Sequence, residues 1–227
     1  EAAARDHDPR ITKSEGAAGG SQEGARADGN SHGFRAGYRE TSHSLSCAGL
    51  ASQGQQMERD FEFTAARDPL ELAAAAVVGR EAASRALARL GAVKLDTRSA
   101  PVLYPARLAR GLVGHLVGAL SGAALYRRAS FLLDSLGTRV LAPHLSIDER
   151  PHLPRGLASA PFDDEGVATV DRRLVDAGVI QGYVLGSYSA RKLGMASTGN
   201  AGGTDRKSTL LNSSHLGISY AVFCLKK

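Results

Sequence analysis

A serine and a lysine three residues apart offer the simplest catalytic chemistry in this sequence. Ser189-Ala190-Arg191-Lys192 matches S-x-x-K, a pattern in which the serine hydroxyl acts as an acylation nucleophile. The companion motifs of such enzymes, S-D-N and K-T-G, do not occur in the 227 residues. A four-residue pattern arises readily by chance, so chance is the favoured interpretation and nucleophilic catalysis is the alternative.

Two histidines stand alone in their segments. His115 lies in GHLVGA, Gly114 to Ala119, within a run rich in leucine and valine. An isolated histidine beside an apolar stripe is expected to be packed with one hydrogen bond, and a contact to a peptide or a partner subunit is the alternative. His152 lies between Pro151 and Pro154 in a rigid loop, where a structural role is expected.

Three further segments carry charge or glycine. The run Asp163-Asp164-Glu165 before Gly166 could bind a cation, but it is typical of a solvated turn. STGNAGG, residues 197–203, could hold phosphate through backbone N–H groups, although it lacks the lysine of a P-loop. Arg127 and Arg128 beside Tyr126 could meet an acidic partner surface, and a solvated pair is the plainer interpretation.

Charge and cysteine content narrow the classes of function. The formal net charge is +5, but residues 205–227 contribute +3 of it, and the remaining 24 basic and 22 acidic residues nearly balance. A nucleic-acid footprint needs clustered basic residues, so this balance argues against one. Cys47 is the only cysteine before residue 205, which favours a reducing, cytoplasmic location. The apolar run 111–126 is shorter than the roughly 20 residues of a membrane span.

The first third of the chain is expected to form a hairpin after a linker-like start. Residues 1–33 are rich in Gly, Ala, Ser and Glu, with a strand near Ile11 and a turn at Asp28-Gly29-Asn30. Residues 34–51 and 55–68 flank the turn SQGQ and should pair as two strands. In the second of these, alternate residues share one face: Met57, Arg59, Phe61 and Phe63.

Two helices are expected next. Residues 68–91 have Asp68 as N-cap, Pro69 at the first helical position and Gly91 just past the end. A second helix should run from Arg107 to Ala124, with an apolar stripe and a glycine ridge that predicts close approach by a neighbouring element. The stripe is Leu108, Leu112, Leu116 and Leu120, and the ridge is Gly111, Gly114, Gly118 and Gly122.

A last pair of strands, residues 167–175 and 179–187, should be joined at Asp176-Ala177-Gly178. A short loop that ends in glycine is typical of a bulged hairpin turn.

Several of these segments together resemble the TldD/PmbA family of metalloproteases, in its PmbA branch. The resemblance rests on SGAALYRRASFLLDSLG (121–137), PHLPRGLASAPFDDEGVAT (151–169) and residues 179–203, with GNSHGF at 29–34 and MERDFEFT at 57–64. It implies an α+β fold with antiparallel sheets and a few helices, in a fragment of a multi-domain protein about twice this long. Residues 1–97 would be part of the middle domain and residues 98–204 the start of the C-terminal domain.

The last 23 residues stand apart from this resemblance. DRKSTLLNSSHLGISYAVFCLKK, residues 205–227, is nearly the translation of a short-read sequencing adapter, so we expect it to be non-native. Because the resemblance covers only part of the family's domains, the chain could also leave sheet edges exposed and fail to fold alone.

The resemblance has a direct consequence for metal chemistry. In the TldD branch the glycine-rich helix carries H-E-x-x-x-H, in which two histidines bind zinc and the glutamate activates water. Aligned on Arg127 and Arg128, the resemblance places the histidines at Gly114 and Ala119 and the glutamate at His115. Glycine and alanine offer zinc no donor atom, so the resemblance implies no catalytic residue, metal or cofactor on this chain.

The function implied by the resemblance is that of a PmbA-type subunit in a complex with a TldD-like subunit. Zinc and the general base would come from TldD, and unfolded or leader peptides would be cleaved. The candidate contacts to peptide or partner are His115, His152 and Arg191. Asn200 stands where the family reads histidine in STGHAGG, which puts a role taken from the family in doubt at that position. The alternative, also implied by the resemblance, is a module that modulates DNA gyrase or another nucleic-acid enzyme.

Overall fold

The computed structural model describes residues 1–202 and the strand backbone at 222–223, so the expectation for residues 205–227 lies almost wholly outside the described residues. The chain divides into two compact units. The first consists of Glu1–Arg26 and Arg39–Pro101, and the second of Ala27–Tyr38 and Val102–Lys227. Both combine antiparallel strands with a few helices, which confirms the expected α+β class.

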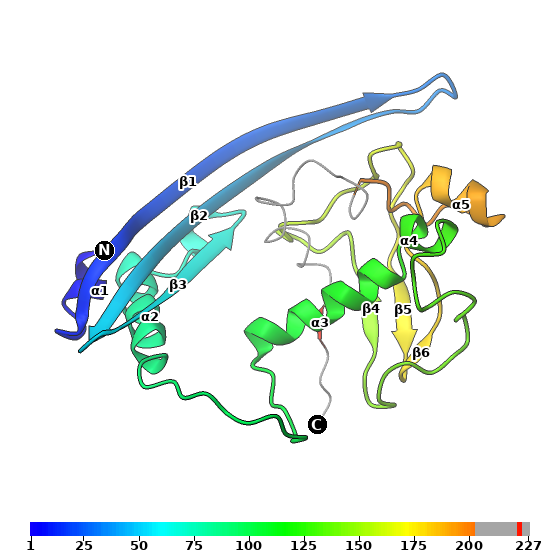
Figure 1. Ribbon diagram of the computed structural model, residues 1–227. Helices are drawn as coiled ribbons and strands as arrows, with labels where there is room; N and C mark the ends of the chain where they lie inside the picture. Colours follow the sequence, from blue (N-terminus) through cyan, green and yellow to red (C-terminus); the bar gives the residue numbers. More distant parts are fainter. Residues whose placement is uncertain (203–221, 224–227) are drawn as a thin grey trace. The chain divides into compact units, whose positions relative to one another are not determined.

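The first unit is built on a three-stranded sheet in the order β1-β2-β3 (Figure 1). Its strands are β1 (Ile11–Gly29), β2 (Arg35–Gln53) and β3 (Gln56–Ala66). The β2–β3 hairpin is confirmed, with Gln53 opposite Gln56 across a turn in which Gly54 has a φ of +60°. A positive φ is easily reached only by glycine, which explains its place there.

The strand expected near Ile11 is confirmed, but the linker-like character expected over residues 1–33 is wrong. Residues 2–5 form the short helix α1 (Ala2–Arg5), and β1 continues for 19 residues. Gly and Ala have low strand propensity, but hydrogen bonding to β2 stabilises the strand in spite of it. Leu45 of β2 reaches to within 3.4 Å of where a side chain on Gly19 would begin, so a large residue fills space opposite a small one.

One helix covers one face of this sheet through very small side chains. The helix α2 (Ala75–Ala88) lies against β3 and α1, and it buries alanines at 82, 83 and 86. Gly49 of β2 lies against the backbone of Ala82 and Ala83. Near this contact α2 also forms ion pairs with carboxylates of β3. Arg85 pairs with Glu62, and Arg89 lies 3.3 Å from Glu58.

The start of the expected helix at Asp68 is also wrong. Asp68 does act as a cap, since its carboxylate accepts the Leu70 N–H at 2.9 Å, but the element it caps is the 3₁₀ turn η1 (Pro69–Glu71). The α-helix begins only at Ala75. Thr64 of β3 accepts the Ala73 N–H at 3.1 Å, so the connecting segment is held by the sheet and cannot continue as helix. Gly91 lies beyond the helix with a φ of +75°, as predicted.

The second unit contains three helices and a four-stranded sheet in the order β6-β5-β4-β7. The helices are α3 (Ala106–Ala119), α4 (Gly122–Tyr126) and α5 (Ser187–Leu193). The strands are β4 (Ile147–Glu149), β5 (Arg172–Asp176), β6 (Val179–Ile180) and β7 (Val222–Phe223). The core lies between helices and sheet and includes Leu120, Leu125, Val175, Ile180 and Leu185.

The turn between β5 and β6 is tighter than expected. Asp176 pairs with Val179, so the loop has two residues, and both Ala177 (φ 46°) and Gly178 (φ 82°) are left-handed. Two positive φ angles identify a type I′ turn and not a bulged one. Glycine is required at 178, because a side chain there would begin 2.2 Å from the Leu141 carbonyl oxygen. The paired strands are also shorter than expected.

The helix expected from Arg107 to Ala124 is interrupted at Leu120 and Ser121. The Val184 N–H donates to the Leu120 carbonyl at 3.0 Å, and the Gly122 N–H donates to the Val184 carbonyl at 2.8 Å. Backbone groups that pair with a neighbouring segment cannot also serve an α-helix. A new helix, α4, therefore begins, with the Ser121 hydroxyl accepting the Ala124 N–H as its N-cap.

A buried carboxylate joins the acidic turn to the glycine-rich loop. Asp163 is 6% exposed, and its oxygens accept the N–H groups of Glu165 and Val167 at 2.9 Å and of Ala201 at 2.8 Å. The expectation of a solvated turn is therefore wrong at Asp163. The neighbouring Phe162 is also buried, beneath the rings of Phe34 and Tyr38 from the second unit's segment 27–38.

We expect Gly122→Ala to lower the free energy of unfolding by about 1–3 kcal/mol, as overpacking does in tight cores. An added methyl would begin 2.2 Å from Ser189 Oγ and 2.9 Å from Leu185 Cδ2. Gly111→Ala is the matched control, because that position on α3 has nothing within 4 Å and should gain up to about 1 kcal/mol of helix propensity. Equal urea midpoints for the two variants would contradict the packing described here.

Asp163→Asn should destabilise the second unit by about 1–3 kcal/mol, because an amide presents only one oxygen to three N–H donors. Hydrogen exchange at the Ala201 and Val167 amides reports this locally, and both should exchange faster. Glu165→Gln serves as control, since Glu165 is exposed and accepts only the Ser187 N–H. Unchanged protection of both amides in Asp163→Asn would refute the role assigned to this carboxylate.

Candidate functional site

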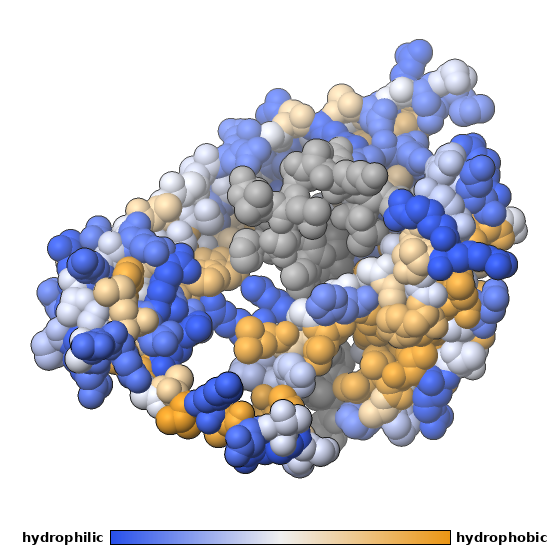
Figure 2. Space-filling model, viewed as in Figure 1, coloured by the Kyte–Doolittle hydropathy of each residue, from blue (hydrophilic) through white to orange (hydrophobic). Residues whose placement is uncertain are grey.

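The helix α3 carries the positions that resemble a metal motif, and it is poorly covered within its own unit. Val113 is its one buried residue. Leu108 and Leu112 are 62% and 50% exposed, whereas Leu116 and Leu120 pack on the core. The expected leucine stripe is thus buried only at its C-terminal end. Figure 2 shows apolar side chains along this helix on the face in view.

The three motif positions differ in environment. Gly114 and His115 are exposed and Ala119 is half-buried. The expectation of a packed His115 is wrong, because His115 is exposed on the side of α3 opposite to the buried Val113 and the core-packed Leu116. Ala119 ends the helix, and the Ser130 hydroxyl donates to its carbonyl at 2.6 Å.

The glycine ridge is approached closely at one end only. In the described part of the chain nothing lies within 4 Å of where side chains on Gly111, Gly114 and Gly118 would begin. At Gly122 the Ser189 side chain fills that space. The close approach predicted from the ridge is therefore found at the contact between α4 and α5 and not along α3.

The residues on α3 do not fit a zinc ion. Gly114 and Ala119 carry no nitrogen, oxygen or sulfur in their side chains, and a catalytic zinc needs about three protein ligands and an open position. Within residues 1–202 no group of three or more histidine, cysteine, aspartate or glutamate side chains is placed to hold a metal ion. His115 alone cannot form such a site.

The glycine-rich loop at 197–202 is a structural element. The Thr198 and Asn200 N–H groups donate to the Leu185 carbonyl, the Gly199 N–H donates to Ser197 Oγ, and the Ala201 N–H donates to Asp163. A phosphate cradle needs free N–H groups and a positive field. These N–H groups are engaged and a carboxylate lies among them, so the phosphate interpretation is wrong.

Asn200 is held in a charged network within the second unit. Arg172 donates to Glu149 at 2.5 Å, to Asn200 Oδ1 at 2.8 Å and to the Tyr183 carbonyl at 2.6 Å. The Asn200 amide nitrogen donates in turn to Glu149. Both sides of the amide are therefore satisfied by partners of the appropriate kind. This arrangement ties the loop to β4 and β5 and orients Asn200 as part of the scaffold.

The serine–lysine pair does not form a nucleophile. Ser189 is 2% exposed, and its hydroxyl donates to the Gly186 carbonyl at 3.1 Å within α5. The Lys192 ammonium lies over the Tyr188 ring, 5.7 Å from its centroid. A buried hydroxyl that is bonded to its own helix has neither a base nor access to a substrate. The chance interpretation of S-x-x-K therefore agrees with the geometry.

The other predicted contact residues lie on separate segments. His152 is exposed, and its Nε2 lies 3.0 Å from Thr169 Oγ1. Because that hydroxyl donates to the Ala160 carbonyl, the imidazole must be the donor, which suits a structural role. Arg191 is exposed on the last turn of α5. Among the described residues no hydrogen bond or ion pair joins His115, His152 and Arg191.

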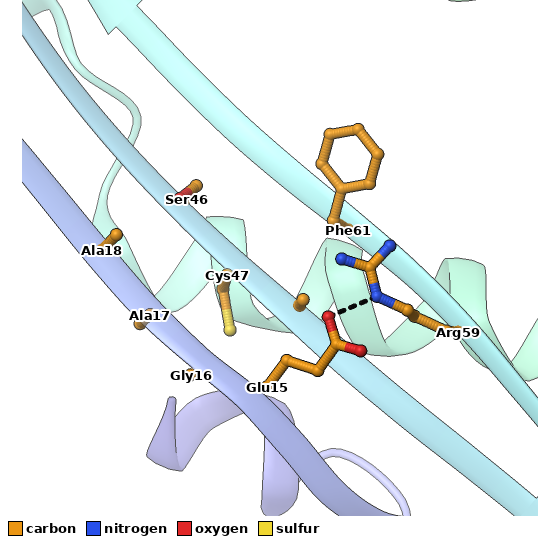
Figure 3. Close-up of a pocket in the computed structure, with 9 residues that line it drawn as sticks. Glu15, Gly16, Ala17, Ala18, Ser46, Cys47, Arg59 and Phe61 are labelled. Atoms are coloured by element: carbon orange, nitrogen blue, oxygen red, sulfur yellow. Dashed lines mark hydrogen bonds and ion pairs between the residues drawn. The ribbon is translucent and has the colours of Figure 1, made fainter. Parts of the chain in front are cut away.

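A shallow pocket of about 270 Å³ lies on the sheet of the first unit (Figure 3). Its wall includes Phe61 and the ion pair between Glu15 and Arg59, which connects β1 to β3 across β2. Cys47 also borders it but is 3% exposed and belongs to the core beneath α2. Glu15 and Arg59 neutralise each other, so the two charged side chains that line the pocket are paired.

Sequence reasoning missed the roles of three charged residues that organise the second unit around its glycine-rich loop. These residues are Asp163, Glu149 and Arg172. The run of three carboxylates indicated a turn, and nothing in it distinguished the buried one from its neighbours. Glu149 and Arg172 lie 23 residues apart, and their pairing becomes evident only when β4 and β5 align.

In the described residues no helix is long and apolar enough to cross a bilayer.

Comparison with known proteins gives two family matches that divide the chain. The PmbA/TldA metallopeptidase central domain matches residues 1–90, and the PmbA/TldA metallopeptidase C-terminal domain matches residues 97–219. The second match thus extends into the segment that resembles an adapter translation.

Relatives and solved structures agree with these matches. The chain is 48% identical to Metalloprotease PmbA of Escherichia coli O157:H7 and 46% identical to the PmbA homologue of Haemophilus influenzae. In each case 89% of this chain aligns, and it spans 45% of the relative.

Among solved structures, a protein of Thermotoga maritima named as a candidate modulator of DNA gyrase superposes with a TM-score of 0.79 at 25% identity. That alignment covers 88% of this chain and 46% of the other. TldE of Thermococcus kodakarensis superposes with a TM-score of 0.71 at 25% identity, covering 87% and 44%. The chain belongs to the PmbA/TldD metallopeptidase family, in its PmbA branch.

Proposed function

We propose that this chain is part of a PmbA-type subunit that works with a TldD-like subunit in a cytoplasmic peptidase complex. The TldD-like subunit supplies the zinc and the general base, and the PmbA-type subunit contributes binding surface for unfolded or leader peptides. The observation that carries the proposal is that Gly114 and Ala119, which the resemblance aligns with zinc-binding histidines, have no donor atom in their side chains.

The exposure of α3 supports a binding role for this surface. A surface helix normally turns its apolar stripe to its own core, but half of the stripe on α3 remains exposed within its unit. Such a helix offers apolar contact area, and the glycines at 111, 114 and 118 let another backbone come close. His115 adds an imidazole that can donate or accept a hydrogen bond.

The proposal that the TldD-like subunit supplies the zinc predicts that the PmbA-type subunit binds no metal of its own. The full-length protein that contains this chain, purified alone, should retain far less than one zinc per polypeptide after dialysis and should not hydrolyse an unfolded peptide. Addition of a zinc-loaded TldD-like subunit should restore hydrolysis, because metal and base then come from one chain and binding surface from both. Metal content is measured by mass spectrometry and cleavage by fluorescence of a quenched peptide.

Two outcomes of that experiment would overturn the proposal. Stoichiometric zinc together with peptidase activity in the PmbA-type subunit alone would mean that it has its own catalytic site. Full activity of the TldD-like subunit by itself, unchanged on addition of the PmbA-type subunit, would mean that no shared site exists.

A substitution on α3 tests the contact role of the exposed imidazole. His115→Ala should leave the unfolding midpoint of the chain nearly unchanged, since substitutions at exposed sites typically alter stability by less than about 0.5 kcal/mol. In the assembled complex it should raise the KM for peptide or the Kd for the TldD-like subunit by about threefold to tenfold, the effect of a lost hydrogen bond. His32→Ala, exposed on segment 27–38, is the matched control. No difference between the two variants would remove His115 from the binding surface.

A further inference from the structure

A group of cations and tyrosines lies at the end of α4 and along α5 in the second unit. The two helices contact each other, with Gly122 against Ser189 and the Tyr126 ring against the Tyr188 ring, so the end of α4 lies beside α5. Figure 2 shows strongly hydrophilic side chains over these two helices. We call this group the cationic tyrosine patch, and its members are Tyr126, Arg127, Arg128, Tyr188, Arg191 and Lys192.

The two rings hold the patch together. Tyr126 and Tyr188 meet edge to face, with centroids 5.7 Å apart and planes at 82°. The Arg127 guanidinium carbon lies 5.6 Å from the Tyr126 centroid, and the Lys192 ammonium lies 5.7 Å from the Tyr188 centroid. Cation–ring contacts of this length fix where two of the positive charges sit. Tyr188 remains 51% exposed and reaches solvent between them.

The four cations have no carboxylate partner among the described residues. Elsewhere in the same unit arginines are paired, for example Arg172 with Glu149 and Arg173 with Asp148. Four positive charges gathered without counter-charge repel one another and create a local positive potential. Their position at two helix C-termini favours cations, but it does not require four of them. A bound anion would relieve the repulsion.

Arg128 adds an observation on backbone conformation. Its φ is +55°, and its N–H donates to the Leu125 carbonyl at 2.9 Å directly after the C-cap of α4. Glycine is the usual residue at this left-handed position, because a side chain there is strained. An exposed arginine therefore occupies a place where the fold itself prefers glycine, and its side chain contributes charge to the patch at some expense in stability.

We infer that the cationic tyrosine patch binds an acidic segment of another polypeptide. Aspartate or glutamate carboxylates would pair with Arg127, Arg128 and Arg191, and apolar groups of the segment would lie on the exposed face of Tyr188. This inference goes beyond the peptidase proposal, because it needs neither zinc nor a TldD-like subunit. We choose a protein ligand over nucleic acid on the ground of charge.

The near balance of charge before residue 205 supports the same choice. A binding site for a nucleic-acid backbone usually extends along many phosphates and needs a broad excess of basic residues. Here 24 basic residues stand against 22 acidic ones, so this part of the chain carries little excess positive charge overall. A short acidic peptide matches a patch of this size.

Fluorescence anisotropy with the full chain tests the inference directly. The probes are a fluorescein-labelled glutamate-rich peptide that contains one leucine, its glutamine counterpart, and a single-stranded oligothymidylate of equal charge. At low salt the glutamate peptide should bind at least about tenfold more tightly than the glutamine peptide, and the difference should fall in about 0.5 M salt.

Matched variants separate binding from folding. The double variant Arg127→Gln with Lys192→Gln should weaken binding of the glutamate peptide about tenfold. Arg80→Gln with Lys94→Gln removes the same charge from exposed positions in the first unit and should have little effect. Arg128→Gly should weaken binding about threefold while raising the thermal unfolding midpoint, because it removes a charge and a strained side chain together. Stability and affinity then move in opposite directions, which loss of folding cannot produce.

Several outcomes would overturn the inference. Equal affinity for the glutamate and glutamine peptides would remove the electrostatic basis of the site. Equal losses in the patch and control double variants would reduce the effect to net charge. Tighter binding of the oligothymidylate than of the glutamate peptide, lost in the patch variant, would assign the surface to nucleic acid.

Discussion

The backbone pairing between residues 120–122 and Val184 organises the second unit. It ends α3 at Ala119, because carbonyl and N–H groups that bond to a neighbouring segment are withdrawn from the helix. It also starts α4 at Gly122 and brings this glycine against Ser189 of α5. The same pairing thus sets which part of α3 reaches the core and where α4 lies against α5. Both surfaces to which we assign binding depend on it.

The region around the glycine-rich loop is organised by hydrogen bonds that involve charged groups. Asp163 gathers three N–H donors, and the Arg172 guanidinium links Glu149, Asn200 and a main-chain carbonyl. Hydrogen bonds to ionised groups are roughly twice as strong as neutral ones, and a buried carboxylate requires them. They hold the glycine-rich loop against β4, β5 and the acidic turn, so the loop is part of the scaffold. The binding roles that we propose lie elsewhere, on the surfaces of α3, α4 and α5.

Membership in a metallopeptidase family does not by itself establish that this chain binds a metal. The family matches establish descent and fold, whereas the ability to bind zinc depends on donor atoms at particular positions. Gly114 and Ala119 lack such atoms while the helix that carries them is preserved. A helix without donor atoms at these positions agrees with the subunit that we propose, which would contribute binding surface and leave the metal to a partner.

The amino-acid sequence by itself determined the strand pair at residues 35–66, the cap at Asp68, the absence of donor atoms at Gly114 and Ala119, and the family. These follow from local patterns, namely alternation, capping chemistry and side-chain type. Tertiary structure alone decided that the glycine- and alanine-rich residues 11–29 form a strand, that the helix expected to Ala124 breaks at Leu120, and that Asp163 is buried while Glu165 is exposed. In each case the deciding partner is distant along the chain: β2, Val184 and Ala201. A hydrogen bond between distant residues can override local propensity, because a buried polar group without a partner costs more than an unfavourable local conformation.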